Sequence, residues 1–383
     1  MATQNKIFIT TYITVVSIVY GILIYFFTRF SGFTHSISYS IGFFLALFIF
    51  QLILISVVFL EDISRFFQFL YSLLKSNFSY SESFFPKRRK FISQSAILLA
   101  SIPFSAILYG MYKGKYNYKV LSYNLEFDDL PSSFDGFKIT QISDFHSGSF
   151  DNPKKVEYGL NLINSQNSDV ILFTGDLVNN KTEEVIPWVK SFASLKAPFG
   201  VFSVLGNHDY GDYTNWENEE AKKENMDLMF STQKKMGWKL LNNKSAYINK
   251  NGEKIAIVGV ENWGKGRFKK LGDLNKSVKK IKLEDFKILL THDPSHWDAE
   301  VLKHQYKFHL TLSGHTHGFQ FGIEIPGFLK WSPVQWLYKQ WAGIYKKNSQ
   351  FINVNRGFGY LAYPGRVGIW PEITVITLRK SKV

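Results

Sequence analysis

The sequence predicts an α/β domain that follows a membrane-spanning helical region. Long uncharged runs occupy much of the first 112 residues, and from residue 118 short apolar runs alternate with amphipathic stretches. Runs of the first kind suit membrane helices, and alternation of strands with helices is typical of an α/β fold with largely buried strands. We therefore expect a membrane region over residues 1–117 and an α/β domain over 118–383.

Three uncharged runs are candidate membrane helices. They cover about residues 7–27, 37–60 and 91–112, and each is long enough to cross ~30 Å of hydrocarbon as a helix. The third contains Ser, Gln and a central Pro103, so we expect two to three spans. A buried core helix fits these lengths poorly, and a signal-peptide core is an alternative for the third run only.

Basic residues predict the orientation in the membrane. Residues 61–90 carry six Lys and Arg, whereas the link after the first run carries only Arg29. The richer segment is expected in the cytoplasm, which places the α/β domain of this multi-pass cell-membrane protein on the extracytoplasmic face. Lys113, Lys115 and Lys119 oppose that orientation. Arg88 and Arg89 before an apolar run also fit a twin-arginine export signal, or simply the basic flank of a membrane helix.

Composition narrows the possible chemistry. The chain of 383 residues has no cysteine, which excludes disulfides, zinc ribbons and thiol catalysis. Any metal must therefore be held by His, Asp, Glu or Asn. The net charge is +14, of which +8 lies in residues 1–119. Because most of the excess positive charge sits in the part that meets lipid, nucleic acid is not expected as a partner.

The order of elements in the second region follows from its apolar runs. Strands are expected at 137–143, 169–174, 200–205, 255–260, 286–291, 308–313, 351–355 and 372–378. Helices are expected between several of them, at 153–166, 182–195, 217–236 and 295–304.

Five of these strands are followed by side chains that bind metals. Ligands in α/β sheets lie beyond the carboxyl ends of strands, so these side chains are expected to converge. Taken singly, each of these side chains can be explained as a turn, cap or loop residue. Because such residues follow five of the apolar runs in order, however, together they indicate a site. The candidates are Asp144 and His146, then Asp176, then Asn207, His208 and Asp209, then His292, and finally His315 and His317.

Seven of these candidates, all except His208 and Asp209, are counted as metal donors, and seven are more than one zinc ion would use. Two metals that share one carboxylate would use them all, and two ions ~3.5–4 Å apart can stabilise both the attacking and the leaving oxygen in a displacement at phosphorus. The mixed nitrogen and oxygen donors suit Mn, Fe, Zn, Co or Ni alike. Asp209 either orients His208 or caps the following turn.

The ordered set D-x-H, G-D, G-N-H-D, H and G-H-T-H resembles the calcineurin-like metallophosphoesterase superfamily over about residues 120–383. The resemblance implies a four-layer α/β/β/α sandwich and two divalent or mixed-valence metal ions. It implies attack on the phosphate by a metal-bridging hydroxide, with His208 as proton donor or charge stabiliser. One metal would take Asp144, His146 and His317, the second would take Asn207, His292 and His315, and Asp176 would bridge them.

Two further stretches bear on the substrate. Protein phosphatases of the superfamily carry an acidic residue three positions after the bridging Asp, and Asn179 stands there, which disfavours that activity. Residues 325–347 interleave Trp and Tyr with Lys, which is typical either of a membrane interface or of a surface helix with its aromatics in the core. This stretch and residues 353–374 resemble the membrane-associated branch of the superfamily, which is related to enzymes that act on lipid-linked phosphates. Arg356 and Arg366 are then phosphate contacts, or structural ion pairs.

The leading hypothesis is a membrane-anchored, binuclear-metal phosphoesterase that hydrolyses a phosphate mono- or diester of a lipid or another membrane-proximal substrate. One alternative is a metal-dependent nuclease, which the modest charge of the second region disfavours. The other is a catalytically inactive, membrane-anchored protein that binds a phosphate ligand. Retention of all seven donors disfavours this last reading.

Overall fold

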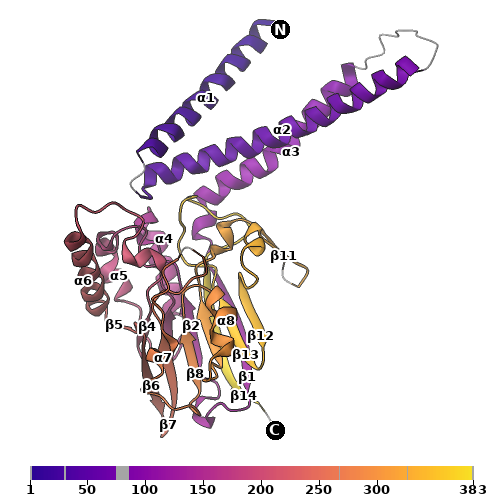
Figure 1. Cartoon of the computed structure of the whole chain (residues 1–383). Helices are drawn as coiled ribbons and strands as arrows, with labels where there is room; N and C mark the ends of the chain where they lie inside the picture. The colour runs from indigo at the N-terminus through magenta and orange to yellow at the C-terminus, as the bar shows by residue number, and fades with distance from the viewer. Residues whose placement is uncertain (1, 30–31, 75–85, 267, 326, 382–383) are drawn as a thin grey trace.

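The computed structural model describes residues 2–29, 32–74, 86–266, 268–325 and 327–381. Three long helices stand at one end of a domain built on two sheets (Figure 1). They are α1 (Ala2–Thr28), α2 (His35–Leu74) and α3 (Pro86–Tyr112), and α2 and α3 pack against each other along their length. All three are long and apolar enough to cross a membrane, as expected from their length and composition.

The second and third helices extend beyond the predicted runs. Helix α2 continues to Leu74 and α3 begins at Pro86, so charged turns flank both apolar stretches. Arg65 lies within α2 and pairs with Glu61 at 2.5 Å, one helical turn away. Arg88 and Arg89 lie near the start of α3. Lys75, counted among the basic residues that predict orientation, lies outside the described residues.

Two six-stranded sheets form the second region. Sheet A has the order β1-β14-β2-β3-β4-β5, and sheet B has the order β12-β13-β9-β8-β7-β6. Strands β2 to β5 run parallel, as do β7, β8, β9 and β13. Sheet A contains β1 (Lys119–Phe127), β2 (Lys138–Ile142), β3 (Val170–Phe173), β4 (Val201–Ser203), β5 (Trp238–Leu240) and β14 (Glu372–Lys380). Sheet B contains β6 (Lys244–Lys250), β7 (Glu253–Gly259), β8 (Lys287–Leu290), β9 (Leu310–Ser313), β12 (Gly343–Lys347) and β13 (Gln350–Val354).

The central strands are apolar on both faces, which explains the layers. In β3, Val170 and Leu172 face the core between the sheets, whereas Ile171 and Phe173 face the outer helices of sheet A. These helices are α4 (Pro153–Asn164), α5 (Val189–Phe192) and α6 (Glu219–Lys235). Helices α7 (Leu274–Ser277) and α8 (Ser295–Ala299) cover sheet B through a third core. The predicted four-layer α/β/β/α sandwich is therefore confirmed.

Several predicted elements differ in detail. The helix expected at 182–195 is a 3₁₀ helix, Thr182–Trp188, followed by the short α5, and Pro187 lies in the 3₁₀ part. The helix expected at 295–304 is α8 followed by a 3₁₀ turn, Val301–Lys303. A separate hairpin, β10 (Ile323–Ile325) and β11 (Leu329–Trp331), with β12 after it, replaces the surface helix considered for 325–347. The edge strand β1 was not predicted, because it is half exposed over most of its length.

The membrane helices are fixed to the domain at the end of α3. Ile107 and Met111 of α3 pack with Tyr363, whose hydroxyl donates to the Ile107 carbonyl at 2.6 Å. The backbone N–H of Arg366 donates to the Gly110 carbonyl at 3.3 Å. Close to α2, the side chain of Asn180 bonds both backbone groups of Phe33 at 3.0 Å. The domain therefore meets the helices through loops that, as shown below, also support its polar centre.

We predict that Gly110→Ala weakens this junction. A Cβ at position 110 would lie 2.6 Å from the Tyr363 hydroxyl and 2.7 Å from the Arg366 carbonyl, so the loop must shift. Overpacking of this kind costs about 1–3 kcal/mol, so the thermal midpoint of the full chain in detergent should fall by about 2–10 °C. Gly21→Ala in α1 is the matched control, because nothing lies within 4 Å of its added Cβ. Equal midpoints for both variants would contradict the tight junction.

Candidate metal centre

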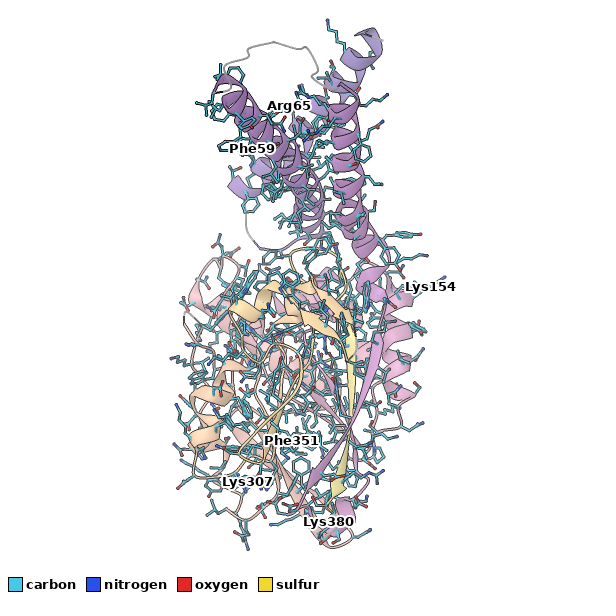
Figure 2. The ribbon with its side chains drawn as sticks, turned by 90° about the vertical axis from the view of Figure 1, so that its right-hand side faces the viewer. Phe59, Arg65, Lys154, Lys307, Phe351 and Lys380 are labelled. Carbon is cyan, nitrogen blue, oxygen red and sulfur yellow. The ribbon has the colours of Figure 1, made fainter. Side chains whose placement is uncertain are left out.

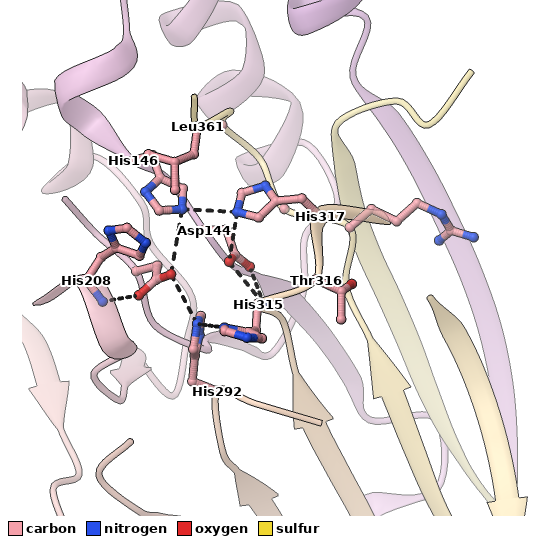
Figure 3. A network of polar contacts seen from close by, with 12 residues as sticks. Asp144, His146, His208, His292, His315, Thr316, His317 and Leu361 are labelled. Carbon is pink, nitrogen blue, oxygen red and sulfur yellow. Dashed lines mark hydrogen bonds and ion pairs between the residues drawn. The ribbon is translucent and has the colours of Figure 1, made fainter. Parts of the chain in front are cut away.

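The predicted donors meet where strands of both sheets end. Asp144 and His146 follow β2, and Asp176 follows β3. Asn207 and His208 follow β4, His292 follows β8, and His315 and His317 follow β9. Because β2, β3 and β4 are parallel in one sheet and β8 and β9 in the other, each set of loops emerges at one edge. Figure 3 shows the side chains converging there.

One group of three side chains forms a compact cluster. Nε2 of His146 lies 3.0 Å from Nε2 of His317, and the latter lies 3.2 Å from Oδ1 of Asp144. Atoms of these three residues all lie within 4.8 Å of one another, and the residues are buried. This group matches the first metal site that the sequence resemblance implies.

A second group lies beside the first. Nε2 of His292 is 3.1 Å from Oδ2 of Asp176 and 3.2 Å from Nδ1 of His315. The amide oxygen of Asn207 is 2.8 Å from the same His315 nitrogen. Oδ2 of Asp176 also lies 3.6 Å from Nε2 of His146, in the first group. Asp176 therefore stands between the two groups, in the position expected of a shared ligand.

Backbone carbonyls fix the rings of two histidines. Nδ1 of His146 faces the Val178 carbonyl at 3.2 Å, and Nδ1 of His292 faces the Thr174 carbonyl at 2.8 Å. A carbonyl can only accept, so Nδ1 of each ring carries a proton, and Nε2 is the atom left to face a metal. Such outer contacts are the usual means of orienting a metal-binding imidazole.

The electrostatics of the cluster suit a cation. Burial disfavours ionisation, but His317 and His292 hold the pKa of Asp144 well below its ordinary value, and His292 and His208 do the same for Asp176. Burial likewise opposes the charge on His292, yet Asp176 and Asp144 raise its pKa to about 10. The two ionised carboxylates thus favour positive charge between them, whether it is a proton on His292 or a metal cation that replaces that proton. The donor set fits two metal ions.

The backbone at these loops is strained. Five of the seven predicted donors have positive φ, a region that residues other than glycine rarely adopt. Such conformations cost of the order of 1–3 kcal/mol each and concentrate at functional sites. The five are Asp144 (φ 53°), His146 (48°), Asp176 (59°), His315 (72°) and His317 (49°).

Asp209 holds two of the loops together. Its carboxylate accepts backbone N–H groups from Gly206, Asp176, Leu177 and Val178, at 2.7–3.3 Å. The residue is fully buried. The sequence left two roles open for Asp209, orientation of His208 and a local cap. The structure shows the local contact, from the N–H of Gly206, and in addition a bridge from the loop after β4 to the loop that carries Asp176.

His208 lies next to both groups without joining either. Its backbone N–H donates to Oδ1 of Asp176 at 2.9 Å, and its ring Nδ1 faces the Asn179 carbonyl at 2.7 Å. The ring of Tyr213 stacks on it with centroids 4.2 Å apart. Asn179, which replaces an acidic residue of the protein phosphatases, thus supports His208 through its main chain.

The two arginines predicted as phosphate contacts have protein partners. Arg356 is 3% exposed and pairs with Glu372 and, at 2.6 Å, with Glu324. Arg366 is fully buried, and its guanidinium donates to the carbonyls of Arg356, Gly357 and Gly359. One of its nitrogens also lies 3.3 Å from Nδ1 of His317. Arg356 therefore forms the ion pair considered for it, whereas Arg366 bonds backbone carbonyls.

Three residues at the centre were missed from the sequence. The hydroxyl of Tyr338 lies 2.9 Å from Nε2 of His315, and that of Tyr213 receives a hydrogen bond from Asn207 at 2.8 Å. Asp293 is buried 3.6 Å from His315, and its Oδ2 has no hydrogen-bond partner among the described residues. The position of Asp293 next to His292 was the only signal in the sequence for these three residues. Tyr213 and Tyr338 lie in loops with no sequence pattern that indicates a role at the centre.

Comparisons with known proteins agree with this geometry. A family model described as calcineurin-like phosphoesterase matches residues 137–319, and one described as the transmembrane domain of a probable calcineurin-like phosphoesterase matches residues 1–115. The uncharacterized metallophosphoesterase YkuE of Bacillus subtilis is 33% identical over 257 residues, which cover 66% of this chain and 82% of YkuE.

Two further similarities extend the comparison. A zebrafish (Danio rerio) transmembrane protein with metallophosphoesterase domain is 26% identical over 72% of this chain, a match that spans 60% of the zebrafish protein. Among solved structures, the phosphopantetheinyl hydrolase of Mycobacterium tuberculosis is 13% identical with a TM-score of 0.34, over 57% of this chain and 89% of the hydrolase.

We predict that Asp209→Ala destabilises the centre. The substitution leaves four buried N–H groups without their acceptor, at ~1–3 kcal/mol each, so both the thermal midpoint and the bound metal of the full chain should fall. Calorimetry and elemental analysis measure the two quantities. Asp128→Ala, at an exposed carboxylate, is the control. Unchanged stability in Asp209→Ala would refute the bridging role.

Proposed function

Because the chain belongs to the calcineurin-like metallophosphoesterase family, we propose that it is a membrane-anchored, two-metal hydrolase of a phosphate mono- or diester, with a lipid-linked or membrane-proximal substrate. The observation that carries the proposal is the pair of donor groups that share Asp176. In this proposal residues 1–117 are the membrane region and residues 118–383 the catalytic domain.

The proposed ligands follow the two clusters. Asp144, His146 and His317 would hold one ion, Asn207, His292 and His315 the other, and Asp176 both. Ions bound there would act as Lewis acids toward a phosphate ester and would make water a better nucleophile. The nitrogen and oxygen donors suit Mn, Fe, Zn, Co or Ni.

His208 is proposed to move the proton. Nδ1 faces the Asn179 carbonyl, which leaves Nε2 to serve the substrate. The hydrogen bond from its backbone to Asp176 and the stacked Tyr213 ring hold the imidazole at the edge of the centre. Once the ring is protonated on both nitrogens, Nε2 can give its proton to the oxygen that leaves phosphorus, and burial, which lowers the pKa of His208, favours that release. A well-placed general acid contributes ~10²–10⁴ in rate.

The location of the centre supports a membrane-proximal substrate. The loop after β3 reaches the segment between α1 and α2 through Asn180, and the loop of Arg366 rests on α3. The centre therefore lies at the helix end of the domain. The basic residues of α2, α3 and the segment between them support the extracytoplasmic placement of that domain by the positive-inside rule.

We predict that the hydrolytic activity depends on bound metal ions. The full chain in detergent, stripped by a chelator, should lose activity toward an aryl phosphate monoester or diester and regain it after reloading with Mn²⁺. Phosphate esters of lipids in mixed micelles should be hydrolysed better than soluble nucleotides, DNA or RNA. Two bound ions without turnover across this panel would point to a binding protein instead.

The second prediction separates metal binding from proton transfer. Asp176→Asn should lower the metal content, because the shared carboxylate is lost. His208→Ala should keep two ions per chain and lose ~10²–10⁴ in kcat, because His208 donates to Asp176 through its backbone N–H, which the alanine variant retains. Elemental analysis beside steady-state kinetics tests both. Full activity in either variant would contradict the role assigned to the substituted residue.

A further inference from the structure

The β10–β11 hairpin turns its charged face toward the domain and its apolar face outward, the reverse of a hairpin on a water-exposed surface. The register pairs Ile323 with Trp331, Glu324 with Lys330, and Ile325 with Leu329. Directly opposed residues share a face and neighbours alternate, so one face of the hairpin carries the apolar pairs and the other carries the charged pair. A hairpin on a soluble domain normally turns its apolar face inward.

Here the charged face is the one turned toward the domain. Glu324 pairs with the buried Arg356 at 2.6 Å, and Arg356 pairs in turn with the buried Glu372 of β14. The amino group of Lys330 donates to the Ala342 carbonyl and lies 4.9 Å from the Trp341 ring centroid. These contacts fix which way the hairpin faces.

The outward face and the segment after it expose large apolar side chains. Ile323 and Ile325 are each 50% exposed, and Phe328 at the turn is 84% exposed. Leu329, Trp336 and Leu337 are exposed as well, as is Phe319 before the hairpin. These seven residues, all between 319 and 337, are more than half of the large apolar side chains exposed in the described part of the domain. Apolar surface concentrated in this way marks an interaction site.

The base of this surface is joined to the membrane helices. The N–H of Gly322 donates to the Val367 carbonyl at 2.9 Å, and the N–H of Val367 donates to the Gln320 carbonyl at 2.8 Å. Val367 also packs against the cluster that α2 and α3 form with Tyr363. Figure 1 shows β11 at the helix end of the domain, and Figure 2 shows Lys307 and Lys380 toward the opposite end.

We propose that this surface, formed by Phe319, Ile323, Ile325, Phe328, Leu329, Trp336 and Leu337, inserts into the interfacial layer of the same phospholipid bilayer that α1–α3 span. The partner is lipid because the surface continues from the membrane helices. Exposed Lys339, Lys346 and Lys347 follow it, and lysines beside tryptophan suit the headgroup layer. The docking holds whatever reaction the centre performs.

This docking also places the centre at the bilayer surface. Phe319 lies two residues after His317, and Tyr338, which contacts His315 at 2.9 Å, follows Leu337 directly. The chain thus leaves the centre at one end of the apolar surface and returns to it at the other. A second anchor beside α3 restricts how far the domain can tilt from the lipid.

The absence of cysteine allows a direct test. Phe328→Cys in the full chain is labelled with an environment-sensitive fluorophore and reconstituted into nanodiscs of phosphatidylcholine and phosphatidylglycerol. Nitroxide lipids that probe about 5–10 Å below the phosphates should quench the label about twofold or more. Leu283→Cys is the matched control: it is 58% exposed and precedes β8, at the end of that strand away from the centre. Its label should be unaffected.

Equal quenching at the two positions would overturn the proposal. So would energy transfer between labelled copies at position 328 without lipid quenching, which would assign the surface to a second copy of the chain. Trp336→Cys provides an independent position on the same surface, and it should report the same depth class as Phe328→Cys. Because both side chains are largely exposed, neither substitution removes a core contact.

Discussion

Negative charge buried where the strands of both sheets end is the constraint on which this protein depends. Asp144 is fully buried and Asp176 nearly so, and both are ionised because imidazoles and main-chain N–H groups surround them. A buried carboxylate is tolerated only when it is compensated. The strained loops, the carbonyls behind His146 and His292, and the bridge at Asp209 all serve to keep that compensation in place.

Much of this arrangement could be read from the sequence, because it depends on local pattern. Apolar runs followed by Asp, Asn or His indicated which strands end at the centre, and the structure brings all seven donors together. The identity of the three membrane helices followed from length and composition in the same way. A single short motif said little about the metal centre, whereas the order of the motifs along the chain predicted which residues meet there.

What the sequence did not reveal depends on contacts between distant segments. No local pattern indicates that Asp209 bridges two loops, that Tyr338 reaches His315, or that Arg356 pairs with both Glu324 and Glu372. The alternation of Ile323, Glu324 and Ile325 predicts two faces, but only the partner of Glu324 shows which face is turned inward. The side chain of Arg366 contacts the His317 ring and its backbone N–H donates to Gly110 of α3, so support of the centre and attachment of the helices share one residue.

The strand order of sheet A also constrains how the chain is made. β1 follows α3 closely in sequence, yet its neighbour is β14, which lies between β1 and β2. During synthesis β1 emerges early and stays unpaired until residues 372–380 have left the ribosome. Pairings so distant in sequence form slowly, and open strand edges promote aggregation. The nascent chain, tethered by α1–α3, therefore keeps β1 and one edge of β2 unpaired until β14 is made, and that interval is when it most needs a chaperone.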